Sequence, residues 1–391
     1  MPAVMLYVQH LLGIGHFMRA RLIAGALADA GFPVYLVSGG MPVGGGLPRG
    51  VSLLQLPPIY AADASLKPLR DALGNPIDDT YRERRRDLLL ATYASVAPAI
   101  VLFETFPFGR RALRFELVPL LERIEATRPR PLVVASVRDI LQVRQKIERE
   151  REMLDAANRW FDAVLVHGDI RFARFEATFP LAAELKPPVH YTGFVRPADD
   201  PPSRPDTVCR REVVVSAGGG AVGMDLLRAA IAAKKGSRFG SMQWRVLVGT
   251  NVKDDDYRFL LGQAGSDTVV ERARVDFAAL LGGAFISVSQ AGYNTVLDVL
   301  TSGARAVFVP FTANGETEQR ARANRIRELE LGIVVEDREL SPATLAAAID
   351  AAGSRDQWGH WDFACDGAAR SATLIAAAAG IDLAQHVEIP T

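Results

Sequence analysis

The stretch FISVSQAGYNTVLDVLTSGARAVFVPFTANGETEQRARANRI, residues 285–326, carries the pattern that decides the fold. An apolar run at Phe285–Val288 ends in a turn, and a helical pattern follows from Tyr293 to Gly303. A second apolar run at 306–311 leads into a polar loop and another helical pattern. This order of strand, helix, strand and helix predicts a βαβ unit of a parallel sheet. The polar residues of the stretch fall at the edge where such sheets bind ligands.

The same alternation of apolar runs and helical patterns extends along both halves of the chain, which favours two α/β domains with parallel sheets. The expected strands are Val4–Gln9, Val34–Ser38, Ile100–Phe103, Leu132–Ser136, Ala163–His167, Val213–Ser216, Trp244–Val248, Phe285–Ser289 and Ala306–Pro310. Residues 196–211 hold four prolines and no periodicity, so they predict a linker. It separates an N-terminal domain at 1–195 from a C-terminal domain at 212–367. An alanine-rich helical pattern at 368–391 could pack back on the N-terminal domain.

The composition is that of an ordinary globular protein. A length of 391 residues favours two domains, and 49% hydrophobic and 23% charged residues suit a sizeable core. Lysine plus arginine equals aspartate plus glutamate at 45 each, so no nucleic acid is expected as a partner. Two cysteines, Cys209 and Cys365, predict neither a zinc site nor a disulfide framework. A reduced, cytoplasmic location is expected.

Membrane segments are not predicted. The start of the chain, MPAVMLYVQH, lacks the features of a signal peptide. The longest apolar stretch, Leu88–Phe103, is interrupted by Pro98 and is too short to span a bilayer. We therefore expect a soluble protein with at most peripheral membrane contact.

A glycine-rich loop with a histidine, Gly13-Ile14-Gly15-His16, follows the first expected strand. A dinucleotide fingerprint would need a third glycine where Met18 stands, and an acidic residue at the end of the next strand, which closes in Ser38-Gly39-Gly40. NAD and FAD are therefore disfavoured. The two glycines instead let a substrate approach the backbone. His16 at a helix N-terminus is kept neutral by the helix dipole and can accept a proton. The alternative is a capping or tightly packed histidine.

A second glycine-rich loop, Gly218 to Gly223, follows the expected strand at Val213–Ser216. Its backbone N–H groups can point at a phosphate, with an ordinary tight turn as the alternative. No Lys-Ser/Thr pair follows the loop, which excludes a P-loop.

Polar residues of the opening stretch have two interpretations each. Asn294 and Thr295 are plausible helix caps. Asp298, about one turn further, could bind both hydroxyls of a ribose or could complement the helix dipole. Glu318 and Gln319 offer the mixture of acceptors and donors that sugar hydroxyls need, with helix capping as the alternative.

The N-terminal half adds weaker candidates. Glu104 opens the segment ETFPFGR after a strand, as a base or ligand on the acceptor side or as a structural residue. His167 also ends a strand, and a structural role is favoured for it. The basic run Arg82–Arg86 is expected to be an exposed helix face.

The segment Ser289–Thr295, SQAGYNT, followed by Asp298, Gly303, Val309-Pro310 and Glu318-Gln319, resembles the donor half of MurG-like glycosyltransferases of family 28, which have the GT-B fold. The two glycine loops fall where that family has its own. The resemblance implies two Rossmann-like domains with parallel sheets facing across a cleft, and a nucleotide-sugar donor on the C-terminal one. It also implies inversion at the anomeric carbon without a metal or other cofactor.

Carried over by position, the resemblance assigns a role to each part. Asp298 would hold the donor ribose, Glu318 and Gln319 the sugar hydroxyls, and the two loops of the C-terminal half the diphosphate. Backbone near Arg274–Phe277 would hold the base, and His16 would deprotonate the acceptor hydroxyl. The implied donor residues are Gly218, Gly219, Gly220, Arg274, Phe277, Gln290, Gly292, Tyr293, Asn294, Thr295, Asp298, Glu318 and Gln319. Those expected on the acceptor side are Gly13, Gly15 and Glu104.

Two departures from the family matter, one at the proposed ribose contact, which the shorter Asp298 still permits, and one on the acceptor side. Asp298 stands at a position where MurG, the family member that acts in peptidoglycan synthesis, has a glutamate. The segments ETFPFGR and Val137–Ile140 (VRDI) do not resemble that enzyme's lipid-acceptor region. The sequence thus predicts a metal-independent inverting glycosyltransferase that uses a UDP- or dTDP-sugar. Its acceptor stays open among small molecules, glycans and lipid-linked compounds. The alternatives are a nucleotide-sugar hydrolase of the same fold and a catalytically silent nucleotide-sugar-binding protein.

Overall fold

The computed structural model describes residues 1–61, 68–143, 147–197, 212–218, 222–274 and 276–383. The chain divides into two compact units. The first unit comprises Met1–Pro197 and Phe363–Thr391, and the second unit comprises Ala198–Asp362. Most of the expected linker, from residue 198 to 211, lies outside the described residues. The chain returns to the first unit at Phe363, a few residues before the expected position 368.

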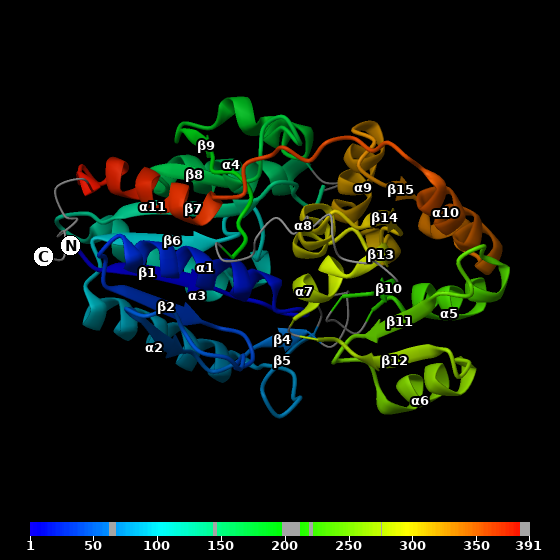
Figure 1. The fold of residues 1–391 in the computed structure, drawn as a ribbon. Coiled ribbons are helices and arrows are strands. Elements are labelled where there is room, and N and C mark those ends of the chain that lie inside the picture. Colours follow the sequence, from blue (N-terminus) through cyan, green and yellow to red (C-terminus); the bar gives the residue numbers. More distant parts are fainter. Residues whose placement is uncertain (62–67, 144–146, 198–211, 219–221, 275, 384–391) are drawn as a thin grey trace, which may run out of the picture. The chain divides into compact units, whose positions relative to one another are not determined.

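In the described part of the first unit, seven parallel strands form one sheet in the order β3-β2-β1-β6-β7-β8-β9 (Figure 1). They are β1 (Val4–Val8), β2 (Val34–Ser38), β3 (Val51–Gln55), β6 (Ile100–Glu104), β7 (Leu132–Arg138), β8 (Ala163–His167) and β9 (Val189–Tyr191). A small antiparallel pair joins β4 (Tyr60–Ala61) to β5 (Leu69–Arg70). The helices are α1 (Gly15–Asp29), α2 (Asp79–Val96), α3 (Arg114–Ala126), α4 (Ile147–Trp160) and α11 (Gly367–Ala378).

Strand β1 shows why the sheet is covered on both faces. All of its residues are buried, because alternate side chains enter two different cores. Met5 and Tyr7 belong to a core shared with α2, α3 and α4. Val4, Leu6 and Val8 belong to a second core shared with α1 and α11. The unalternating apolar runs of the sequence therefore describe strands between two layers of helices.

Helix α11 completes the second of these cores. It lies beside α1, with Ala372, Ile375 and Ala376 buried in the core (Figure 1). The chain arrives there through a close crossing at Gly193 and Gly367. A Cβ on Gly367 would come within 2.4 Å of the Gly193 carbonyl oxygen, so the crossing requires glycine. The alanine-rich end of the chain is thus an integral layer of the first unit.

The described residues of the second unit contain a six-stranded parallel sheet in the order β12-β11-β10-β13-β14-β15. The strands are β10 (Glu212–Ser216), β11 (Gln243–Val248), β12 (Thr268–Arg272), β13 (Ala284–Ser289), β14 (Arg305–Phe308) and β15 (Ile333–Val334). The helices are α5 (Met224–Ala233), α6 (Asp254–Gln263), α7 (Phe277–Gly282), α8 (Tyr293–Ser302), α9 (Glu318–Glu328) and α10 (Pro342–Ser354). Helix α8 begins at Tyr293 and is ended by its C-cap Gly303, whose φ of 70° is left-handed, as the opening stretch predicts.

The basic run Arg82–Arg86 is not the uniformly exposed face that we expected. Arg85 is completely buried on the inner side of α2. Its Nε donates to Oε2 of Glu116 at 2.5 Å, and its Nη2 donates to Oε1 of the same residue at 3.0 Å. Tyr7 Oη also donates to Glu116, at 2.5 Å. This buried group of three side chains joins α2, α3 and β1.

A membrane-spanning segment is also absent from the described residues, because none of their helices is long and apolar enough to cross a bilayer.

Candidate functional site

The carboxyl edge of the first sheet brings three segments together. Strands β1, β6 and β7 are neighbours in parallel register, so the loops that follow them meet at one edge. The loop after β1 contains Gly13 and leads into α1, which begins at Gly15 and carries His16 in its first turn. Strand β6 ends at Glu104, and β7 ends at Arg138. A Cβ on Gly13 would meet nothing within 4 Å, so the loop leaves open space beside its backbone.

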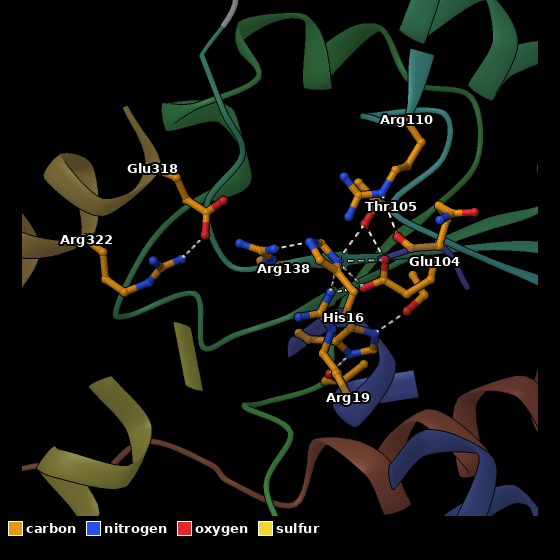
Figure 2. A network of polar contacts seen from close by, with 12 residues as sticks. His16, Arg19, Glu104, Thr105, Arg110, Arg138, Glu318 and Arg322 are labelled. Carbon is orange, nitrogen blue, oxygen red and sulfur yellow. Dashed lines mark hydrogen bonds and ion pairs between the residues drawn. The ribbon is translucent and has the colours of Figure 1, made fainter. Parts of the chain in front are cut away.

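His16 and Glu104 form the centre of this site (Figure 2). Nδ1 of His16 lies 3.1 Å from each carboxylate oxygen of Glu104. The Glu104 side chain is fully buried, and Arg19 of α1 and the Thr105 hydroxyl both donate to it. The carboxylate is thus fixed from three sides. The carboxylate orients the imidazole through its contact with Nδ1, which makes Glu104 a positioning residue for His16.

The hydrogen bonds also determine which ring nitrogen carries the proton. Nδ1 of His16 lies 3.1 Å from the Glu104 carboxylate, which can only accept, and 3.5 Å from Nη2 of Arg19. The carboxylate is the closer partner of Nδ1, and a guanidinium of Arg138 contacts Nε2 and can only donate, so Nε2 is the acceptor. Nδ1 therefore carries the hydrogen and donates it to Glu104. Burial of the ring lowers the pKa of His16 well below its usual value, and the charges of Arg138, Arg110, Arg19 and His10 lower it further. The ring is therefore neutral at neutral pH, and burial is the largest cause of its lowered pKa.

Three arginines of the site, Arg19, Arg110 and Arg138, were not among the candidates from the sequence. Arg138 is the last residue of β7, and Arg110 lies in the segment that follows the neighbouring strand β6. This position at the strand ends is the one signal that pointed to them. The backbone between Glu104 and Arg110 is strained, since Thr105 and Arg110 have φ values of 71° and 58°. Such strain costs about 1–3 kcal/mol per residue and concentrates at functional sites.

His167 has a structural role. It is completely buried at the end of β8. Its Nε2 lies 2.7 Å from the Ser136 hydroxyl, and its Nδ1 lies 2.9 Å from the Thr192 hydroxyl. Burial lowers the pKa of His167 well below its usual value, and the charge of Arg19 adds to the effect. The residue links β7, β8 and the segment after β9.

The stability of the protein should therefore decrease when the pH falls from 7 to 5. His16 and His167 have lowered pKa values in the folded state, so the unfolded chain binds more protons below about pH 6.5. Above that pH the two histidines contribute fully to the free energy of unfolding. Below it, this free energy falls by about 1.4 kcal/mol per pH unit for each histidine that stays neutral in the folded state. Urea unfolding at several pH values measures this slope. The variant His167→Gln should have a shallower slope, and an unchanged slope would contradict the buried neutral state.

In the second unit, the strand register brings the predicted phosphate loops together. Ser216 at the end of β10 pairs with Ser289 at the end of β13, which in turn pairs with Phe308. Gly218 and Gly223 have φ values of 78° and 93°, and a Cβ on Gly223 would come within 2.8 Å of Nε2 of Gln290. The first loop therefore packs closely on the second. Gly219 and Gly220 lie outside the described residues.

Helix α8 is capped differently from the expectation. Its N-cap is Gly292, without a side-chain hydrogen bond, and Asn294 and Thr295 lie inside the first turn. The interpretation of these two residues as caps is therefore wrong, because the helix already begins at Tyr293, before both of them. Their first-turn position at the sheet edge keeps them close to any ligand of the α8 N-terminus. Asp298 lies in the next turn and is half-buried.

The polar residues at the start of α9 make three different contacts. Glu316, which the sequence analysis did not consider, accepts hydrogen bonds from the backbone N–H groups of Glu318 and Gln319 at 2.6 and 3.3 Å. Oε1 of Gln319 accepts from the Phe311 N–H at 3.0 Å and holds the loop after β14. Glu318 pairs with Arg322 at 3.0 Å (Figure 2).

Arg322 connects this helix to the glycine turn. Its Nη1 donates to the carbonyl of Ala291 at 2.9 Å, and its guanidinium lies 5.8 Å from the ring centre of Tyr293. Arg322 is almost completely buried, so it fixes α9 against the start of α8. Glu318 is thereby presented in one orientation near the turn.

Arg274 and Phe277 follow β12, which is two strands away from β10 in the sheet. Arg274 pairs with Asp276 at 2.6 Å, and Phe277 begins α7. The register thus groups the glycine loops with Gln290, while Arg274 and Phe277 come from a more distant strand. The described residues contain no group of three or more His, Cys, Asp or Glu residues that could hold a metal ion.

Two α/β units with parallel sheets are the architecture of the GT-B class of folds. Residues 214–357 match the sequence model of the glycosyltransferase family 28 C-terminal domain. The second unit therefore contains a region similar to the family 28 C-terminal domain, which is consistent with the MurG-like resemblance. No curated protein matches the sequence significantly.

Solved structures with the same fold cover nearly the whole chain. MurG from Acinetobacter baumannii is 15% identical, with a TM-score of 0.55, and the match covers 96% of this chain and 99% of that one. The calicheamicin glycosyltransferase CalG4 is 16% identical, with a TM-score of 0.56 and coverage of 98% and 96%. UGT89C1 from Arabidopsis thaliana, complexed with UDP, is 12% identical, with a TM-score of 0.61 and coverage of 97% and 94%. These likenesses confirm the GT-B fold.

Proposed function

We propose that the protein is a metal-independent, inverting glycosyltransferase that moves a sugar from a UDP- or dTDP-sugar to an acceptor hydroxyl. The observation that carries this proposal is the pair of His16 and Glu104. The imidazole is neutral, its Nδ1–H is held by a buried carboxylate, and its Nε2 carries the lone pair. This is the state that a general base needs.

The reaction follows from this geometry. Nε2 of His16 takes the proton of the acceptor hydroxyl while the oxygen attacks the anomeric carbon of the donor. A new C–O bond forms on one face, and the bond to the diphosphate oxygen breaks on the opposite face with its electron pair. A single in-line displacement inverts the anomeric centre. Glu104 stabilises the imidazolium that forms and does not itself take the proton.

The second unit supports a nucleotide-sugar donor. The helices α5 and α8 both begin after glycine turns at neighbouring strand ends, so their N-terminal N–H groups can receive a diphosphate. Asp298 is the proposed ligand of the ribose hydroxyls, and Glu318 and Gln319 are the proposed ligands of the sugar. UDP is bound in the solved structure of UGT89C1, which supports UDP as the first nucleotide to test.

Replacing Asp298 by alanine should weaken UDP binding by about tenfold or more, because a bidentate carboxylate contact to two hydroxyls would be lost. The experiment is a thermal-shift screen over nucleoside diphosphates, followed by calorimetry of the best one with the wild type and Asp298→Ala. The matched control is Asp356→Ala, because Asp356 is exposed and lies in the same unit after α10. An unchanged affinity for Asp298→Ala would refute the ribose contact.

Turnover separates transfer from hydrolysis. The wild type is incubated with a panel of UDP- and dTDP-sugars, and the released nucleoside diphosphate is measured with and without acceptor pools. Release that depends on an acceptor supports the proposal. Fast, stoichiometric release in water alone would show a nucleotide-sugar hydrolase, and binding without any turnover would show a silent binding protein.

A further inference from the structure

Arg138 occupies the atom of His16 that the proposed reaction uses. Its Nη2 donates to Nε2 of the imidazole. A guanidinium has only donors, so Arg138 and an acceptor hydroxyl compete for the same lone pair. While this contact exists, His16 cannot take a proton from any hydroxyl group, including water. The structure thus shows the base in a closed state, and Arg138 must leave Nε2 before transfer.

The backbone of Arg138 is fixed by the sheet, whereas its side chain is partly exposed to solvent. Arg138 is the last residue of β7, a strand that pairs with β6 on one side and β8 on the other. Its side chain is only half-buried, in contrast to Arg19, which is 2% exposed. A guanidinium at the end of a buried strand can change partners by side-chain rotation alone. The closed state can therefore open without any change in the sheet.

A second arginine faces the same imidazole. Arg110 follows β6, and its Nε donates to the carbonyl of Gln9 at 2.8 Å, which holds it near the ring (Figure 2). Its charge and that of Arg138 both act on His16. Two guanidinium groups from neighbouring strands thus converge on one point of the sheet edge. Convergent guanidinium groups bind carboxylate and phosphate groups with paired, charge-assisted hydrogen bonds.

We propose that the acceptor carries a carboxylate or phosphate group, that Arg138 and Arg110 bind this group, and that its binding draws Arg138 away from Nε2 of His16. This inference rests on the proposed role of His16 as the base. The anion is assigned to the acceptor because the acceptor hydroxyl must come within hydrogen-bond distance of Nε2, which places the acceptor's own substituents beside the departing guanidinium. Binding of the acceptor then exposes Nε2 of His16. Water alone does not expose it, because water carries no anionic group that would draw Arg138 away.

The test uses the full chain with isotope-labelled histidine, and inorganic phosphate as the probe. Titration with phosphate should produce a saturable shift of the His16 NMR signals and should raise the pKa of His16, because Arg138 leaves the ring. In Arg138→Gln the pKa of His16 should already be higher without phosphate, and phosphate should bind at least about tenfold more weakly. Arg138→Lys should be intermediate, since it keeps the charge without the paired hydrogen bonds.

The matched control is Arg111→Gln, which removes an exposed arginine of the same segment that pairs with Glu152. It should respond to phosphate like the wild type. A His16 signal that does not respond to phosphate, or that responds equally in Arg138→Gln, would overturn the proposal. Melting temperatures of all variants verify that they are folded.

A second arm distinguishes the acceptor anion from the donor diphosphate. If the phosphate response persists in saturating UDP or dTDP, and Arg138→Gln binds the nucleotide as the wild type does, the anion belongs to the acceptor. If the nucleotide abolishes the response and Arg138→Gln weakens nucleotide binding, the assignment to the acceptor is overturned. A protein that binds neither nucleotide contradicts the proposed function, whereas the phosphate titration still decides the role of Arg138.

Discussion

Replacing His16 by alanine is expected to lower kcat by about 10²- to 10⁴-fold, the usual contribution of a general base. The affinity for the nucleoside diphosphate should stay unchanged, because the proposed donor residues all belong to the second unit. Single-turnover transfer and UDP calorimetry on the same preparations measure the two quantities. A lower kcat together with an unchanged affinity for the nucleoside diphosphate is the result that identifies a general base rather than a structural histidine.

The control for this experiment is His360→Ala, because His360 is exposed and lies in the second unit. It should leave both the rate and the affinity unchanged. If His16→Ala loses less than about tenfold in rate, His16 is not the general base. A parallel loss of nucleotide affinity would instead mean that the substitution disturbs the fold.

The change Glu116→Gln is expected to destabilise the first unit by about 3–5 kcal/mol, because it leaves the charge of Arg85 buried without its carboxylate. Both side chains are completely inaccessible to solvent. The amide keeps the size of the side chain, so the loss reports the charge rather than a cavity. Chemical denaturation followed by circular dichroism measures the effect.

The exposed pair of Arg111 and Glu152 provides the control for this measurement. Its side chains are 58% and 40% exposed, so solvent screens their interaction. Glu152→Gln should therefore leave the unfolding midpoint unchanged. Equal effects of the two substitutions would contradict the special role of the buried pair. Because Arg85 also donates to the carbonyl of Gly39 at 2.8 Å, a destabilised Glu116→Gln should loosen the segment after β2 as well.

The sequence was sufficient for the central strands and for the ligand edge of the second unit. Runs such as Val213–Ser216 are apolar without alternation because both faces of the strand are buried, and this pattern is visible without a structure. Strands β3, β9, β12 and β15 were not predicted. Strands β3, β9 and β12 are partly exposed and mix polar with apolar residues, and β15 has only two residues. The pairing that stabilises them comes from neighbours far away in the chain.

The arginines of the first site could not be predicted for a related reason. Arg138 meets His16 across 122 positions of sequence, and arginine at the end of a strand is common. Only the register of β1, β6 and β7 shows that these ends share one point. The role of Glu316 was not predicted, because Glu318 stands two residues later and has the same chemistry. The fold was therefore easier to predict than the partners of individual side chains.

The return of the chain to the first unit at Phe363 has a consequence for biosynthesis. The ribosome makes residues 1–197 first, then the whole second unit, and only then the segment that contains α11. Until that segment emerges, the apolar face of α1 with Phe17, Ile23 and Leu27 has no helix beside it. The second unit has its complete sequence before the first unit does, although it starts later. The nascent chain thus exposes a hydrophobic surface that a chaperone can bind until translation reaches α11.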